Sequence, residues 1–334
     1  MKKVSLLTAA IIAGLSATAA NAADVFKGDN LNLAVGGRAE ARADFDKDTN
    51  DRTVADNSRA RVNVLATTEI ADGVQAKGFF EEEINRSGAD DSAGYENRYL
   101  YVGVAGENNE LQYGKTDGSL GMITDYTDIL DAFGGEAGNK TATADRTSNQ
   151  LLYIGTFGGL KVKANANGGG AADTFEKYGH VVKGTIDQGY GVAAQYQLGD
   201  LSFGAGYAYQ KDKDVNVTAG GLTISPNAES QNVLVGASYQ LNDLYLGGLY
   251  TQGKLLDQDY KGFEVASKYD ITDRILLAAA FQQVKFDVAD ETDQTVAANV
   301  HYKFTNAFTT YAGVSKDLNG DKDTIGRLGA ILTF

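Results

Sequence analysis

The sequence predicts an all-β fold, a transmembrane antiparallel up-and-down β-barrel of about sixteen strands. Three observations support this prediction. The chain opens with a secretory signal pattern, no later apolar run is long enough to span a bilayer as a helix, and a final alternating stretch ends on the aromatic Phe334. Lipid offers the backbone no hydrogen-bond partners, so only helices and closed barrels can span it, and the barrel is the candidate that remains.

Residues 1–22 have the features of a cleaved signal peptide. Lys2 and Lys3 precede an apolar stretch over 4–20, and Ala20-Asn21-Ala22 is a small-x-small cleavage site. We therefore exclude 1–22 from the fold and expect 23–334 to form a single barrel domain. Losing two lysines makes the formal net charge, −14 for the whole chain, still more negative.

The composition excludes several kinds of site. There is no Cys, which removes disulfides, thiolate metal sites and Cys nucleophiles. The acidity argues against a nucleic-acid partner, because phosphate binding needs clusters of Lys and Arg. The loop acids Asp46, Asp48, Asp317 and Asp321 lack the Gly and distal Glu of a calcium loop. We predict no cofactor and no metal site.

Alternation of period two is clearest over 295–304 and 232–241. In the first stretch, apolar residues from Val296 to Phe304 occupy every second position, and Asn299 and His301 lie between them. This pattern is typical of a barrel with apolar residues towards lipid and small or polar residues towards water. By the same parity we expect four aromatics to form an outward interfacial girdle: Tyr101, Tyr239, Tyr302 and Phe304.

Short turns and long polar stretches alternate between the predicted strands. Seven short turns rich in Gly, Asn and Asp, assigned to the periplasmic side, are centred at 71–73, 106–109, 158–159, 198–200, 242–243, 272–273 and 305–306. The longer stretches, assigned to the outside, are 46–56, 85–96, 115–146, 167–188, 211–230, 254–260, 288–293 and 318–322. The expected strands are 31–45, 57–70, 74–84, 97–105, 110–114, 147–157, 160–166, 189–198 (or 179–187 in its place), 201–210, 231–241, 244–253, 261–271, 274–287, 294–304, 307–317 and 323–334.

Four stretches resemble the general diffusion porins of Gram-negative outer membranes, which are trimers of sixteen-stranded barrels. They are 58–62 (Ser-Arg-Ala-Arg-Val) followed by Thr68-Glu69; 97–103 (Asn-Arg-Tyr-Leu-Tyr-Val-Gly); 113–115 leading to 126–135 (Tyr-Thr-Asp-Ile-Leu-Asp-Ala-Phe-Gly-Gly); and the terminal Phe334. The resemblance extends along the whole chain, and its most specific part is the stretch 126–135.

The resemblance implies that the third extracellular loop folds into the lumen and faces a ladder of arginines. Asp128 occupies the family's acidic loop position; Ala132 stands where a second acid is usual, and Asp131 replaces the usual Pro. Asp125 is a further candidate, and the alternative for all three acids is a polar loop tip. The basic wall positions are Arg38, Arg61 and Arg98, with Arg146 after the loop; Arg42 and Arg59 share strand parity with Arg38 and Arg61.

A lumen position is favoured for the strand arginines, because a charge facing lipid costs about 2–4 kcal/mol at mid-depth. The alternatives are a solvated surface position or a contact with lipopolysaccharide phosphate. Facing acids and bases across a narrow wet gap create a strong field that apolar solutes cross poorly. Acids crowd the loops, among them Asp51, Asp56, Glu82, Glu83, Asp90 and Asp91. We therefore expect a weakly cation-selective pore for ions and small hydrophilic solutes.

The resemblance further implies a homotrimer in which loop 85–96 reaches a neighbouring subunit, contacts with outer-membrane lipid and lipopolysaccharide, and Phe334 as a signal for the barrel-insertion machinery. Other functions remain open: a substrate-specific channel, a barrel adhesin or a barrel enzyme. An enzyme is disfavoured, because the only histidines, His180 and His301, have no nucleophile motif nearby. A substrate-specific channel is ranked lower, because most aromatics lie on outward parity.

Overall fold

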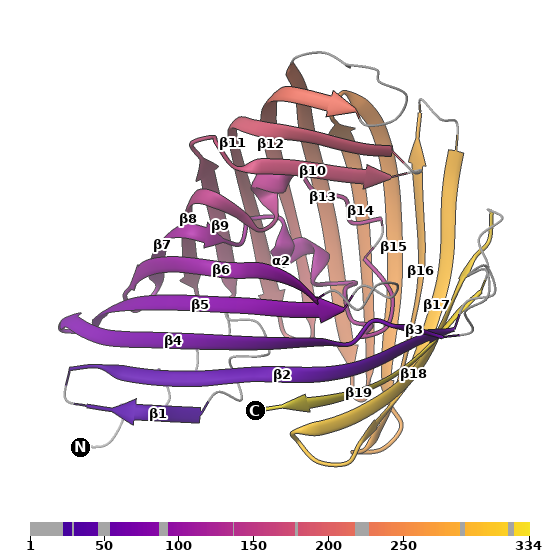
Figure 1. Cartoon of the computed structure of the whole chain (residues 1–334), viewed down its shortest axis with the longest axis horizontal. Coiled ribbons are helices and arrows are strands. Elements are labelled where there is room, and N and C mark those ends of the chain that lie inside the picture. The colour runs from indigo at the N-terminus through magenta and orange to yellow at the C-terminus, as the bar shows by residue number, and fades with distance from the viewer. Residues whose placement is uncertain are drawn as a thin grey trace.

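Sixteen strands close into one antiparallel ring. The structure of the protein is a computed structural model that describes residues 23–28, 30–45, 54–86, 93–135, 137–177, 180–217, 227–287, 291–319 and 324–334. Within these ranges each of sixteen strands pairs with a neighbour on both sides, and the last pairs with the first (Figure 1). The fold prediction is therefore confirmed.

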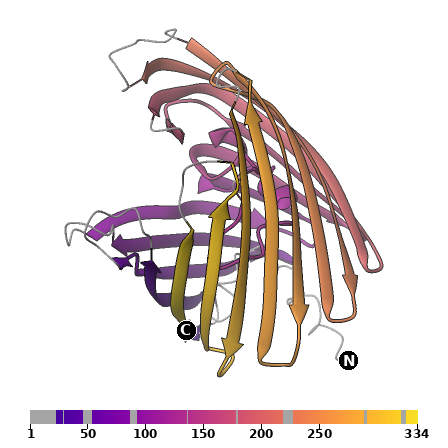
Figure 2. The same cartoon turned by 90° about the vertical axis from the view of Figure 1, so that its right-hand side faces the viewer.

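The ring follows the order of the chain, with short hairpin connections visible at one end of the strands in Figure 2. Its strands are β2 (Asn32–Phe45), β4 (Arg59–Ala71), β5 (Val74–Arg86), β6 (Ala93–Ala105), β7 (Asn109–Thr116), β8 (Thr147–Phe157), β9 (Leu160–Asn167), β11 (His180–Leu198), β12 (Leu201–Val217), β13 (Asn227–Leu241), β14 (Leu244–Leu255), β15 (Gln258–Asp270), β16 (Ile275–Phe286), β17 (Glu291–Lys303), β18 (Phe308–Asp317) and β19 (Ile325–Thr333). All seven predicted short turns join consecutive strands of this ring.

The ends of the chain meet on β2. β19 pairs with β2 from Arg38 to Phe45, and Phe334 exchanges two backbone hydrogen bonds of 2.8 and 3.0 Å with Gly37. A β-carbon at Gly37 would lie 2.8 Å from the Phe334 ring, so glycine makes room for that ring. β1 (Ala23–Lys27) pairs with the beginning of β2, where β19 has already ended.

Side chains alternate between the two faces of the wall as predicted for 232–241 and 295–304. On β13, Val233 and Val235 are exposed, whereas Asn232 and Leu234 are buried on the other face. Tyr239, Tyr302 and Phe304 lie on the exposed, outward side as expected. The structure has no helix in its described part long and apolar enough to cross a membrane.

The predicted outward position of Tyr101 is wrong. Its side chain is 5% exposed and packs against Phe79, with ring centroids 5.6 Å apart, while Leu100 and Val102 beside it face outward. The cause is a β-bulge: the pairing shifts between Glu81 and Glu82, which leaves Arg98 unpaired in the register. An inserted residue reverses the parity along a strand, so Arg98 and Tyr101 both face the lumen.

Several strands extend further than predicted. β11 covers both predicted alternatives, 179–187 and 189–198, except for residue 179. β10 (Ala172–Lys177) forms an antiparallel hairpin with β11. β12 and β13 reach into the predicted connection 211–230, and β3 (Ala55–Asp56) adds a short pairing to β2. Most residues of these extensions are polar or Gly, so the extensions lack the apolar alternation that marks the membrane-embedded part of a strand.

Candidate functional site

The described part of the segment between β7 and β8, residues 117–135 and 137–146, lies inside the ring. It contains the short helix α2 (Gly121–Thr124) and the 3-10 helix η3 (Ala142–Ala144). Its polar contacts reach β9, β12, β13, β15, β17 and β19. A segment can contact strands so far round a closed ring only from within, so it narrows the lumen.

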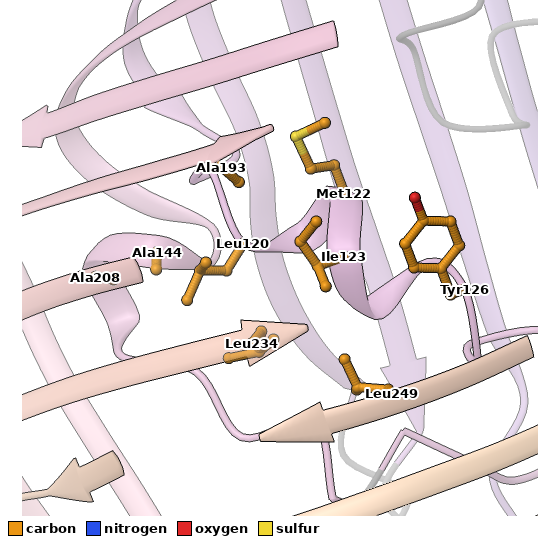
Figure 3. Close-up of a cluster of buried hydrophobic side chains, with 9 residues drawn as sticks. All are labelled: Leu120, Met122, Ile123, Tyr126, Ala144, Ala193, Ala208, Leu234 and Leu249. Carbon is orange, nitrogen blue, oxygen red and sulfur yellow. The ribbon is translucent and has the colours of Figure 1, made fainter. Parts of the chain in front are cut away.

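Figure 3 shows the apolar contact that fixes the beginning of this segment to the wall. Leu120, Ile123 and Tyr126 pack with Leu234 of β13 and Leu249 of β14 in a buried cluster. Burial of each large apolar side chain contributes about 1.5–3 kcal/mol. The segment is thus held against β11 to β14 by a small core of its own, although it lies in a lumen.

Inward-facing glycines recess the wall beneath the segment. A β-carbon at Gly206 on β12 would lie 2.5 Å from Leu120 Cδ2, and one at Gly236 on β13 would lie 2.5 Å from Tyr126 Cδ2. Atoms cannot pack at such distances, so the missing side chains provide the space that the segment fills. Alternate glycines on one strand face, as at 189/191 and 204/206, are the signal that sequence reasoning missed.

Glu264 on β15 is the strongest polar anchor of the segment. Glu264 is 2% exposed, and its carboxylate accepts hydrogen bonds from Ala137 N at 2.7 Å, Gly138 N at 2.9 Å and the Thr127 hydroxyl. Sequence reasoning missed Glu264, although a single acid at inward parity between Phe263 and Val265 is a recognisable signal. Other wall groups accept from the segment backbone: Asn165, Gln210 and Asn232.

The carboxylates of Asp125 and Asp128 are exposed in the part of the segment that the wall leaves uncovered. Crowding by protein atoms limits their hydration and raises the pKa of both groups above the usual range; Lys163 acts against this for Asp125, and Lys140 for Asp128. Lys140 itself is engaged, with its ammonium 3.2 Å from Asp145 Oδ1.

Asp131 faces the opposite side of the ring. Its Oδ2 lies 3.2 Å from Nδ1 of His301 on β17, and it interacts electrostatically with Arg38 on β2. Ala132, at the position where the resemblance led us to expect a second acid, is 4% exposed and packs against Tyr311. In this chain the acid at 131, rather than position 132, is therefore the one directed into the lumen.

Five of the predicted arginines form a group on the inner face of β2, β4 and β6: Arg38, Arg42, Arg59, Arg61 and Arg98. Three acids that sequence reasoning did not place there lie among them: Glu40, Glu81 and Glu83. Arg146 belongs elsewhere. It stands where the segment rejoins the wall, with Nη2 3.2 Å from Glu96 Oε1 and its guanidinium 5.2 Å from the Tyr99 ring centroid.

The predicted loop acids do not lie together. Asp56 is exposed on β3, Glu83 faces the lumen on β5, and Glu82 lies on the outward parity of β5. The acids that lie outside the described residues are Asp46, Asp48, Asp51, Asp90, Asp91 and Asp321, and residues 87–92 of loop 85–96 lie outside them too.

A closed antiparallel barrel with apolar residues outside and a charged, narrowed lumen defines a channel-forming barrel of a membrane. The family model described as Gram-negative porin matches residues 7–322, and the chain belongs to this family. It is 35% identical to porin-like protein L of Photobacterium profundum, over 94% of this chain and 92% of that protein. It is 37% identical to outer membrane protein U of Vibrio vulnificus, over 80% and 75% of the two chains.

Solved structures agree with the fold. Salmonella typhi OmpF, in complex with daunomycin, aligns with a TM-score of 0.74 at 18% identity, covering 93% of this chain and all of that one. The trimer form of Vibrio cholerae OmpT aligns at 0.69, with 19% identity and coverage of 92% and 100%. The protein is thus an outer-membrane porin, a channel rather than an enzyme.

Proposed function

We propose that this porin is a weakly cation-selective, water-filled channel for the passive diffusion of ions and small hydrophilic solutes. The observation that carries the proposal is the exposure of Asp125, Asp128 and Asp131 on the lumen segment, where the Asp131 carboxylate lies 3.2 Å from Nδ1 of His301 on the wall. Walls of low dielectric constant focus the field of such charges, which concentrates cations in the narrow part of the pore. The lumen segment sets the size limit for permeating solutes, and its surplus of exposed acids makes the channel prefer cations over anions.

Planar-bilayer recording of the refolded protein tests this proposal. In a KCl gradient we expect a reversal potential of the sign that marks potassium preference. Liposome swelling should be fast with monosaccharides and slow with larger sugars. A reversal potential of the opposite sign would overturn cation preference, and vesicles impermeable to sugars would overturn the open pore.

The substrate-specific channel remains the weaker candidate. Phe79, Tyr99 and Tyr101 do face the lumen, but Phe79 and Tyr101 are 3% and 5% exposed. Rings that are covered by neighbouring side chains offer no face on which a sugar could stack. Phe79 and Tyr101 therefore pack within the wall and offer no stacking surface to a solute.

We also propose the following assembly. Residues 1–22, outside the described part of the chain, are removed as a signal peptide, and 23–334 form the barrel domain. Three copies associate, in line with the trimer form in which OmpT has been solved, and contact lipid and lipopolysaccharide. Phe334, exposed on the outward face, is read by the insertion machinery. Cross-linking in native membranes should give trimers, and Phe334→Ala should slow the appearance of folded protein.

A further inference from the structure

We propose that Glu40, Glu81 and Glu83 are selectivity-determining residues, which cancel much of the positive charge of the arginine wall. The inference rests on the proposed function, since it explains why a pore lined by five arginines prefers cations. Without these carboxylates the arginine group would attract anions along one side of the lumen. With them, the exposed acids of the segment determine the sign.

Glu40 lies among three arginines of the wall group, Arg38, Arg42 and Arg59. Glu40 as a whole is 2% exposed, with Arg59 Nε 2.6 Å from one carboxylate oxygen and Arg42 Nη2 2.9 Å from the other. Arg38 Nη2 lies 3.8 Å away, and the Tyr311 hydroxyl donates a further bond of 2.5 Å. A carboxylate with this many donors stays ionised, so it contributes a full negative charge among three guanidinium groups.

Glu81 and Glu83 act in the same way on the neighbouring strands. Arg98 Nε lies 2.8 Å from Glu81 Oε1, and its Nη1 lies 3.6 Å from Glu83 Oε2. Arg61 donates to the same Glu83 oxygen. Glu81 is 0% and Glu83 5% exposed, so neither carboxylate can be neutralised by bulk counter-ions as a surface acid would be.

The pairing also fixes where the arginines lie. Each of the five guanidinium groups contacts a carboxylate on its own or the next strand, and their side chains are 12–21% exposed. The guanidinium groups are therefore held along the wall instead of extending across the lumen. Five positive and three negative charges leave a net charge of about +2 on this face. A permeating ion therefore experiences this net charge and not the charge of all five arginines.

The size of the effect follows from Coulomb's law. A unit charge about 7 Å from an ion in water, screened by salt at 0.1 M, changes the local energy by about half of RT. That change lowers the local cation concentration and raises the local anion concentration by about 1.6-fold each. Removing one glutamate charge should thus reduce the potassium-to-chloride permeability ratio about two- to threefold.

The test is the reversal potential of full-length Glu40→Gln, Glu81→Gln and Glu83→Gln channels in a KCl gradient. Asp243→Asn, in an exposed periplasmic turn, is the matched control for loss of an acid. Each of the three variants should lower the permeability ratio two- to threefold, and the control should not change it. Unchanged ratios in all three folded variants would overturn the inference.

A double variant separates charge from structure. Glu40→Gln with Arg59→Gln removes an ion pair and leaves the net charge as it was, so its permeability ratio should return towards the wild-type value. If the permeability ratio of the double variant stays as low as that of Glu40→Gln, the change results from a rearranged wall and the inference is wrong. The wild-type reversal potential tests cation preference itself, whereas the changes between variants test the glutamates, so the two failures are distinguishable.

Discussion

Replacing Glu264 by alanine should release the middle of the lumen segment while the barrel stays folded. The variant leaves two buried backbone donors, Ala137 N and Gly138 N, and the Thr127 hydroxyl without their acceptor. Hydrogen bonds to a charged group contribute about 1.5–3 kcal/mol each, and a buried donor left unpaired costs about 1–3 kcal/mol. Because such terms are not additive, we expect a local loss of about 3–5 kcal/mol over 127–138.

The apolar contact at Leu120 and Ile123 is untouched by this change, so the first part of the segment should remain docked. Single-channel recording should therefore give a larger and noisier conductance, and liposomes should swell faster with disaccharides. Glu69→Ala, at an exposed position on β4, is the control and should behave as wild type. Unchanged conductance and sugar cut-off in a folded Glu264→Ala protein would refute the assignment of Glu264 as an anchor.

Three further predictions concern the same segment. Gly236→Val should displace Tyr126 and change the conductance, because a β-carbon there would lie 2.5 Å from the ring, whereas Gly78→Val, which meets nothing within 4 Å, should not. The pKa of Asp128 is raised, so its carboxylate becomes protonated at a higher pH than an ordinary aspartate as the solution is acidified, and the cation preference of the channel should decline at that higher pH. Reversal-potential measurements at several pH values should show that Asp128→Asn removes part of this pH dependence. Ala132→Glu should loosen the segment and raise sugar permeability, since position 132 is buried against the wall, while a variant that swelled and conducted like wild type would contradict that placement.

Much of the barrel is predictable because lipid imposes a simple pattern on the part of each strand that crosses it. Val233 and Val235 on β13 alternate with inward residues since one face meets hydrocarbon. The turns are equally legible, because tight hairpins need Gly, Asn or Asp. Where strands extend beyond the bilayer, as in β11 and β12, this selection is absent, and the predicted ends were too short.

The lumen was harder to predict, because its contacts join distant parts of the chain. A single bulge at Arg98 reversed the parity that had placed Tyr101 outward. Glu264 and Glu40 look like ordinary strand acids, and only the closed ring brings them to the segment and to the arginines. The positions of Asp128 and Arg38 came from family resemblance, and alternation alone could not have assigned them to a constriction.

The pairing at the beginning of β2 has a consequence for how the cylinder is sealed. β19 covers this edge of β2 only from Arg38 onwards, and β1 continues along the same edge from Lys27 to Ala23. The part of β2 from Asn32 to Val35 is therefore paired with β1 although β19 does not reach it, and an unpaired backbone donor that faced hydrocarbon would cost several kcal/mol. With β1 paired beside it, the nine-residue strand β19 can close the barrel against β2, which has fourteen residues. Deletion of β1 should leave the beginning of β2 unpaired on this side, and thermal unfolding of the barrel should then begin between β19 and β2.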